Sequence, residues 1–219
     1  MLRAICVLWL VSLLPVAGAP AVSPDSQRRK AKAPVAKAPA KTATKTTLDV
    51  TCPSDLGKGV KSKRTFCDVT VGTDPASGVV MRVPPHVGST TLRFDLHNRF
   101  AVSGNALPFT RASALVAVLN GNNGAVIERA AVLGELRTEL DLFDRIAGAG
   151  PGNSKTVAPG RAQSVTITLP AGVTSISIVG VRVELTTKDG RAEYATAGRP
   201  VAITSNLRIE YTPATVSKQ

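Results

Sequence analysis

Ser175-Ile-Ser-Ile-Val-Gly-Val-Arg-Val-Glu-Leu185 is the stretch that decides the fold. Apolar and polar residues alternate along it, which is typical of a β-strand with one buried face. The apolar residues keep one parity up to Ile178 and the other from Val181 onward, so the alternation slips at Val179-Gly180. A glycine at such a slip predicts a β-bulge or a strand that passes from one sheet to another.

Similar patterns recur along the chain and predict further strands. They lie at Val79–Val83, Thr91–His97, Ala112–Leu119, Ser164–Leu169 and Asn206–Tyr211. One-sided alternation is typical of antiparallel sheets with one face in water. In the strand around Phe94 it places Arg93, Asp95 and His97 on the water side, so His97 is predicted to be an exposed, salt-linked histidine.

Turn residues separate these patterns. Asn120–Gly124 and Lys188–Gly190 predict tight hairpin turns. About nine or ten strands over roughly 165 residues are typical of an all-β, two-sheet antiparallel sandwich, which we expect to be a jelly-roll, with an immunoglobulin-like sandwich as the alternative. The leucine spacing after Leu136 allows at most one short helix, at about 137–147. We place this domain at 48–213, with a short C-terminal tail at 214–219.

The first 21 residues predict export. Arg3 precedes a short apolar run, and Ala19-Pro20-Ala21 follows it, which is the form of a secretory signal peptide cleaved after Ala21. The run is shorter than the roughly 20 residues of a membrane span, although an uncleaved anchor is the alternative. We therefore expect a secreted or periplasmic protein. Cleavage would remove Cys6, and the remaining Cys52 and Cys67 predict one disulfide.

Residues 22–47 predict a disordered basic linker, because lysine, alanine and proline dominate it and leave little to bury. Its basic residues, which we call the basic arm, are Arg28, Arg29, Lys30, Lys32, Lys37, Lys41 and Lys45. Their only acidic companion is Asp25. Such an arm is either a soluble spacer or an electrostatic attachment to an anionic envelope polymer or membrane surface. Export argues against nucleic acid as the partner.

Residues for catalysis or metal binding are scarce. Two histidines, His86 and His97, are too few for a histidine-rich metal site, and no G-x-S-x-G motif is present. We expect no cofactor and no metal. Loops on a rigid sandwich commonly carry recognition, so the loops at 120–124 and 148–160 are the predicted contact surface. The residues singled out there are Asn120, Asn122, Asn123, Asn153 and Lys155.

One acidic motif has a family counterpart. Glu139-Leu-Asp-Leu-Phe-Asp144 resembles the E-x-D-x-x-E motif of the laminarinase-like retaining glycoside hydrolases, which are also jelly-rolls. The resemblance implies Glu139 as the nucleophile, Asp141 as its assistant and Asp144 in place of the acid/base. Retaining chemistry needs two carboxyl groups about 5 to 5.5 Å apart. The alternative interpretation of the motif is a solvated acidic surface.

These features favour a non-catalytic, exported β-sandwich that binds or scaffolds a cell-envelope or extracellular partner. Two alternatives from other classes stay open. One is an extracellular polysaccharide hydrolase that uses Glu139 and Asp141. The other is a structural subunit that assembles through a sheet edge.

Overall fold

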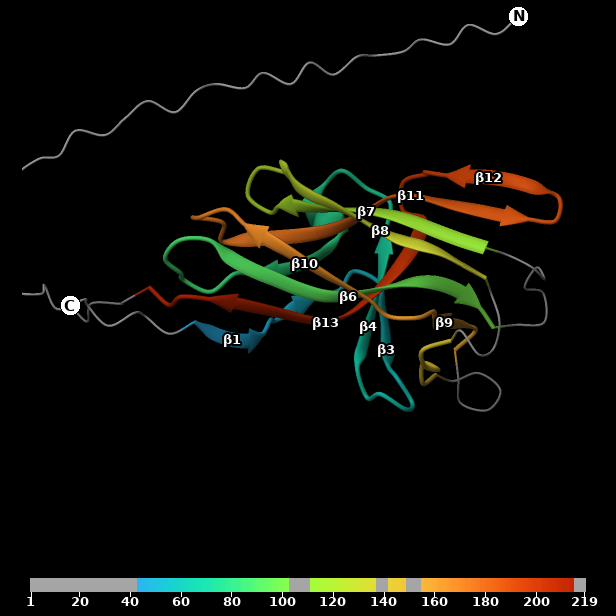
Figure 1. Ribbon diagram of the computed structural model, residues 1–219, viewed down its shortest axis with the longest axis horizontal. Coiled ribbons are helices and arrows are strands. Elements are labelled where there is room, and N and C mark those ends of the chain that lie inside the picture. Colours follow the sequence, from blue (N-terminus) through green and yellow to red (C-terminus); the bar gives the residue numbers. More distant parts are fainter. Residues whose placement is uncertain (1–42, 103–110, 137–141, 149–154, 215–219) are drawn as a thin grey trace, which may run out of the picture. The chain divides into compact units, whose positions relative to one another are not determined.

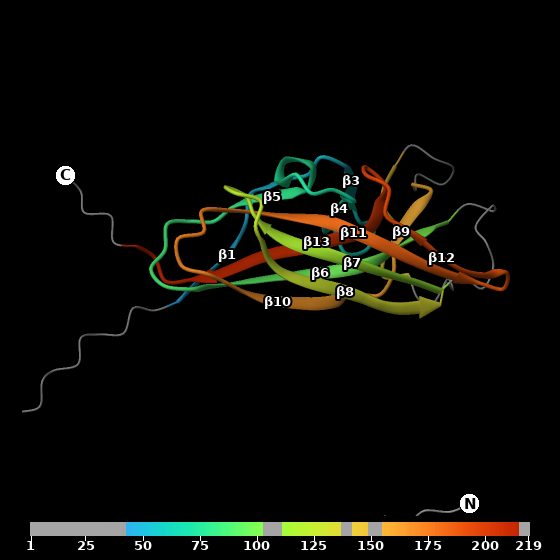
Figure 2. The same cartoon turned by 90° about the horizontal axis from the view of Figure 1, so that it is seen from above.

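The computed structural model describes residues 43–102, 111–136, 142–148 and 155–214. The chain divides into two units, 1–39 and 40–219, and all described residues lie in the second. This second unit is built from two antiparallel sheets that pack face to face (Figures 1 and 2). The predicted two-sheet sandwich is therefore confirmed.

The first sheet has seven strands. They are β1 (Thr44–Thr47), β3 (Asp55–Lys58), β4 (Thr65–Thr70), β6 (Thr90–Ala101), β9 (Val157–Pro159), β10 (Gln163–Leu169) and β13 (Pro200–Tyr211). The second sheet has six strands. They are β2 (Val50–Thr51), β5 (Val79–Arg82), β7 (Arg111–Asn120), β8 (Val126–Leu136), β11 (Ser175–Thr187) and β12 (Gly190–Tyr194).

The strand order is that of a jelly-roll. The first sheet runs β10-β6-β13-β4-β3, and the second runs β2-β5-β11-β7-β8. With β9 and β12 set aside, the strands from β4 to β13 alternate between the two sheets except at the β7–β8 hairpin. Each sheet therefore contains neighbouring strands that are distant in sequence. This interleaving is the double Greek key of the jelly-roll rather than the order of an immunoglobulin sandwich.

The main core lies between the two sheets and is made of the inward side chains that the alternation predicted. Its fully buried members include Val69, Leu92, Phe94, Leu96, Val116, Val118, Leu169, Ile176, Ile178 and Ile209. Burying such side chains contributes on the order of 1.5 to 3 kcal/mol each. These residues hold the sheets together and make the sandwich a rigid support for its loops.

The slip at Gly180 is a bulge, as predicted. The register between β11 and β7 shifts between Gly180 and Arg182. At the same place the chain leaving β4 crosses to the second sheet, and Val71 forms a parallel bridge with Gly180. A Cβ on Gly180 would lie 2.4 Å from Cγ2 of Val201 and 3.0 Å from the backbone of Val71. Glycine is needed here because another strand passes directly over it.

A second apolar cluster lies on the outer face of the first sheet. It consists of Leu56, Phe66, Ile146, Val157 and Ile203, with Phe143 packed against it. Residues 142–148 and 155–160 cover this face through backbone hydrogen bonds such as Phe143 N–H to Pro159 O (2.9 Å) and Ala147 N–H to Lys58 O (2.9 Å). The prediction that Asp95 and His97 are exposed is therefore wrong. Alternation identifies the apolar side of a strand, but it does not show whether the polar side is exposed to solvent.

The folded domain begins earlier than predicted. Strand β1, at Thr44–Thr47, pairs with Arg208–Tyr211 of β13. Lys45 lies in this strand and forms an ion pair with Glu210 at 3.7 Å. The boundary at 48 is thus four residues too late, and Lys45 belongs to the sheet rather than to the basic arm. A short polar strand that covers a sheet edge leaves no alternation long enough to detect.

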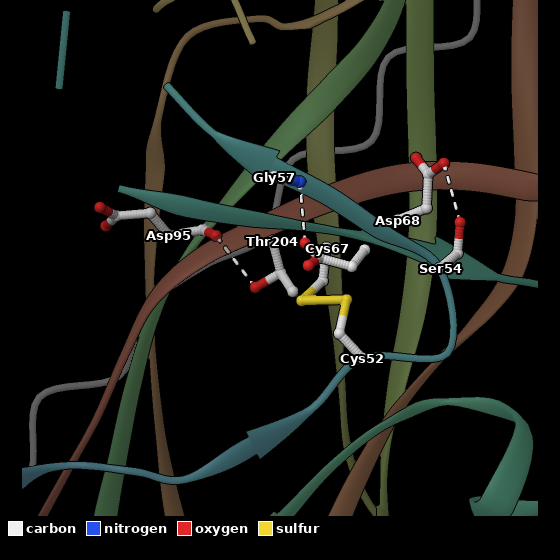
Figure 3. Close-up of a disulfide and its surroundings, with 8 residues drawn as sticks. Cys52, Ser54, Gly57, Cys67, Asp68, Asp95 and Thr204 are labelled. Atoms are coloured by element: carbon white, nitrogen blue, oxygen red, sulfur yellow. Dashed lines mark hydrogen bonds between the residues drawn. A yellow bond between two sulfur atoms is a disulfide. The ribbon is translucent and has the colours of Figure 1, made fainter. Parts of the chain in front are cut away.

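Cys52 and Cys67 form the predicted disulfide (Figure 3). Cys67 lies in β4, so the bond ties the segment that carries β2 to the first sheet. The enclosed residues include β3, which pairs with β4 as a hairpin. Closing a loop of this length contributes roughly 3 kcal/mol in the chain-entropy model.

The segment expected to be helical is only partly described. Residues 137–141 lie outside the described residues, and 142–148 contain no helix. Ile146 is fully buried and bridges to Gly59. The loop predicted to reach Pro159 contains β9, which pairs with Arg99–Ala101 of β6. Among the described residues, no helix has the length and hydropathy of a membrane span.

Candidate functional site

A hollow of about 350 Å³ opens in the first sheet, along one side of β13. Two strands share that side: β1 pairs with Arg208–Tyr211 and β4 with Pro200–Ser205. Between them β13 has no strand partner, and the hollow lies at this break. Its lining residues are Thr47, Leu48, Asp49, Val50, Arg64, Thr65, Cys67, Asn206 and Leu207.

A bulge in β13 positions Asn206 at this break. The register between β13 and β6 shifts between Ser205 and Arg208, and Asn206 has a positive φ of 57°. Asparagine adopts this left-handed conformation more readily than most residues. The bulge turns the Asn206 amide toward Asp95 of β6, and its Nδ2 donates to Asp95 Oδ2 at 2.9 Å. Bulges that re-aim a side chain in this way are frequent next to functional sites.

Asp95 anchors the polar side of the hollow. Its carboxylate accepts hydrogen bonds from Arg64 Nη1 (2.7 Å), Ser164 Oγ (2.9 Å) and Asn206. Burial alone would raise the pKa of Asp95, but the hydrogen bonds from Asn206 and Ser164 and the charge of Arg64 outweigh it, so its pKa lies below the ordinary value. Asp95 is therefore an ionised acceptor that is already engaged.

The lining of the hollow contains two charged residues, Asp49 and Arg64, and Arg64 is the cationic one. Its side chain is 37% exposed, and one nitrogen, Nη1, is bound to Asp95. The guanidinium carbon also lies 5.1 Å from the centre of the Phe143 ring. A guanidinium has five N–H donors in a rigid fork, so Arg64 is held in place on one side and retains donors for a ligand on the other.

His97 lies next to this network but is closed off from solvent. Nδ1 of His97 donates to the carbonyl of Gly160 (2.9 Å), and Nε2 accepts from the hydroxyl of Ser205 (3.0 Å). Burial lowers the pKa of His97 below its usual value, despite the Gly160 bond and the Asp95 charge that act to raise it. The imidazole is thus neutral and packed between Phe66 and Phe143.

Asp144 of the acidic motif is engaged with backbone. Its carboxylate accepts N–H donors of Lys61 (2.9 Å), Ser62 (2.7 Å) and Arg145 (2.7 Å). Burial would raise the pKa of Asp144, but these bonds and one from the Ser62 side chain lower it below the ordinary value. An ionised carboxylate cannot give up a proton, so Asp144 is not placed as a general acid. Glu139 and Asp141 lie outside the described residues.

The asparagines of the predicted contact loop stabilise the β7–β8 turn. Oδ1 of Asn120 accepts the N–H of Asn122, and Oδ1 of Asn123 accepts the N–H of Ala125, both at 3.0 Å. The amide of Asn122 is bonded to the hydroxyl of Thr174 at 2.9 Å. A shallow hollow of about 560 Å³ separates this turn from the 3₁₀ turn at Pro75–Ser77.

The two predicted contact loops do not come together. The β7–β8 turn bonds to the start of β11, where Gly121 N–H donates to Ser175 O. Lys155 lies at the opposite end of the sandwich, because β9 and β10 run its length between the two loops (Figure 1). Asn153 lies outside the described residues. These residues cannot form one site.

Arg64 and Asn206 were missed because their sequence signals are weak. Arg64 sits in a basic run between the cysteines, which indicates nothing beyond a solvated loop. Asn206 begins a stretch that alternates regularly, and the bulge lies at its first residue. Within the described ranges, no three His, Cys, Asp or Glu side chains gather as metal ligands would.

No protein-family model and no curated protein matches this sequence. Among solved structures, the chain is similar to the K1 cleaved adhesin domain of Lys-gingipain from Porphyromonas gingivalis W83. That match has 8% identity and a TM-score of 0.34, and covers 79% of this chain and 99% of that one. A likeness this weak says nothing about what the present chain binds.

Proposed function

We propose that this chain is a non-catalytic binding module that acts after export, and that the hollow beside Arg64 is its recognition site. The observation that carries the proposal is the break along β13, where a partly exposed guanidinium and the Asn206 amide meet above an apolar floor. A pocket with an apolar lining, a few convergent polar groups and a perturbed titratable neighbour is a default site for a ligand.

The state of the other polar groups supports a binding role over a catalytic one. His97 and Ser205 are fully buried. Asp144 is bonded to three backbone N–H groups. Asp95 accepts three hydrogen bonds and holds Arg64 and Asn206 in place. These contacts make a rigid frame around the hollow, which suits the recognition of a polar ligand that offers acceptors to Arg64.

A filled-hollow variant tests this proposal. Thr65 is an exposed residue of β4 that lines the hollow, so Thr65→Tyr should occupy it without disturbing the core. Thr186→Tyr places the same side chain on an exposed position of β11, in the second sheet, as a matched control. The chain from Val22 onward would be screened on glycan and polymer arrays. Binding that Thr65→Tyr abolishes and Thr186→Tyr keeps supports the site; binding that both variants keep refutes it.

We also propose that the chain is exported and that the basic arm supplements binding through charge. The Cys52–Cys67 disulfide is compatible with an oxidising compartment. N-terminal sequencing of the exported chain should begin at Val22. Replacing the arm's arginines and lysines other than Lys45 by glutamine should weaken binding to anionic vesicles at low salt and change nothing at 0.5 M salt. If the arm is only a spacer, the variant should bind the vesicles as well as the natural chain does at both salt concentrations.

Self-assembly through a sheet edge is a second candidate. Strand β8 lies at the end of the second sheet, and three of its apolar side chains, Val126, Leu133 and Leu136, are exposed. Leu133 is 73% exposed. However, the side chains of Gln163 and Asn98 form hydrogen bonds with the backbone N–H and C=O of Leu133. These bonds oppose the pairing of another strand with the edge at this residue. Analytical sedimentation should show oligomers that dissociate in the Leu133→Lys variant. A natural chain that stays monomeric at high concentration rejects this candidate.

A further inference from the structure

Two arginines lie opposite each other on the open part of the first sheet. Arg208 of β13 pairs in register with Arg93 of β6, and both side chains are exposed. The row continues to Thr47 of β1, opposite Arg208, and to Thr166 of β10, opposite Arg93. These four residues, which we call the arginine row, cross four neighbouring strands that lie side by side in Figure 1.

The arginine row is electrostatically unfavourable by itself. Like charges placed directly opposite each other on antiparallel strands destabilise a sheet. Arg93 donates to Thr166 Oγ1 at 3.2 Å. Among the described residues, neither arginine of the row has an ion pair with a carboxylate. A ligand that supplies negative charge would remove this repulsion.

The neighbouring rows show what the arginine row lacks. On one side, Asp95 is held by Arg64, Ser164 and Asn206. On the other side, Glu210 pairs with Lys45. Both flanking rows therefore contain a carboxylate beside cationic and hydroxyl groups. The arginine row offers the same guanidinium and hydroxyl donors without an acid.

We infer that the arginine row binds the carboxylate groups of an acidic, uronate-bearing polysaccharide laid across the sheet. This inference rests on the proposed binding function and names its ligand class. The planar guanidinium fork matches a carboxylate in a bidentate arrangement. Strands about 4.8 Å apart make the row roughly 15 Å long, which suits several units of an extended polymer. Thr47 also lines the hollow, so the row and the hollow are continuous.

The hydroxyl groups favour a polysaccharide over a nucleic acid. Thr47, Thr166 and, one row further on, Thr168 are exposed hydroxyl-bearing residues that can donate to and accept from sugar hydroxyls. Binding of single-stranded nucleic acid usually relies on aromatic side chains on which bases stack. The rows that surround Arg93 and Arg208 contribute arginine, lysine, threonine, serine, asparagine and acidic residues, and no aromatic ring.

The test uses the chain from Val22 onward and polygalacturonate as the probe, at 0.15 M NaCl. The variant is Arg93→Gln with Arg208→Gln. The charge-matched control is Arg129→Gln with Lys188→Gln, which removes two exposed cations from β8 and the β11–β12 turn. We expect the first variant to weaken binding at least tenfold and the control to weaken it less than twofold.

Three results would overturn the inference. Equal loss in both variants would mean attraction to net charge alone. Equal affinity for a neutral galactan would mean that the carboxylates do not matter. In the third result, a single-stranded oligonucleotide binds as tightly as polygalacturonate does and loses affinity equally in Arg93→Gln with Arg208→Gln. That result would assign the row to polyanions of another class. The proposed function fails separately, when no array ligand responds to Thr65→Tyr.

Discussion

The imidazole Nε2 of His97 accepts a hydrogen bond from the hydroxyl of Ser205 at 3.0 Å, and both side chains are fully buried. A base next to a hydroxyl is the pairing from which nucleophilic sites are built. Here Phe66 and Phe143 pack against the ring, and the carbonyl of Gly160 accepts the one ring N–H, at Nδ1. The pair therefore serves the packing between the first sheet and the segment that covers it.

The first prediction concerns pH. The pKa of His97 is lower in the folded chain than in the unfolded one, so protonation favours unfolding. The stability that His97 contributes is complete above about pH 6.5 and is lost as the pH falls toward its lower folded value. Urea midpoints should therefore drop between pH 7.5 and pH 5. His97→Gln should flatten this slope; an unchanged slope in His97→Gln contradicts the assignment.

The second prediction concerns Asp144. Asp144→Asn replaces an acceptor of three backbone N–H groups by an amide that must turn an NH₂ toward one of them. We expect a loss of about 1 to 3 kcal/mol in the free energy of unfolding. Asp49→Asn, at an exposed aspartate, should cost nearly nothing. Urea unfolding measures both, and equal stabilities would show that the carboxylate does not anchor residues 61 and 62.

The third prediction concerns Gly180. Gly180→Ala would place a Cβ 2.4 Å from Cγ2 of Val201 and 3.0 Å from backbone atoms of the crossing strand. Overpacking of this kind costs about 1 to 3 kcal/mol. Adding Val201→Ala should recover only part of the loss, because the backbone contact remains. The matched change Gly134→Ala meets the flexible side chain of Arg111 and should cost much less in thermal melts.

The fourth prediction concerns the disulfide. Replacing Cys52 and Cys67 together by serine should lower the free energy of unfolding by about 2 to 4 kcal/mol. A dithiol reductant should lower the free energy of unfolding of the natural chain by a similar amount, seen as a lower Tm, and leave the double variant unaffected. If the reductant shifts both proteins equally, the bond is not the cause.

The fifth prediction concerns the repulsion within the arginine row. Arg208→Gln removes one of two like charges that face each other, so it should raise the free energy of unfolding by about 0.2 to 1 kcal/mol at low salt. The gain should shrink at 0.5 M salt because exposed charges are screened. Arg182→Gln, which removes the ion-pair partner of Glu193, should give no gain. A salt-independent gain would argue for a packing effect instead.

The sequence predicts a feature of this structure when the residues that form it lie close together along the chain. It does not predict a feature that depends on residues far away in the sequence. The slip at Gly180 predicted a bulge because the alternation on both sides is long and regular. The burial of His97 could not be predicted, since the residues that cover it lie between Phe143 and Gly160, far along the chain. Asn206 was assigned to a regular strand because a single extra residue at the start of an alternating stretch leaves no trace in it.

The same limit applies to the candidate site. The arginine row exists only because three distant pairings bring Thr47, Arg208, Arg93 and Thr166 into register. Each of these residues by itself is an ordinary exposed side chain on a strand. The hollow likewise requires β1 and β4 to share one side of β13, and strand order of that kind is not encoded in local periodicity.

The order of β1, the disulfide and β4 along the chain limits how much of the domain a pull on its N-terminal end can extend first. A pull on the chain ahead of Thr44 loads the β1–β13 pair first. Once β1 and β2 are stripped away, the tension reaches Cys52 and passes through the covalent bond into β4, inside the sheet. The slack released before that point is limited to residues 44–51, about 27 Å of extended chain. In an oxidised molecule the residues between the two cysteines therefore cannot be extended by the pull, whereas in a reduced molecule they add to the length released.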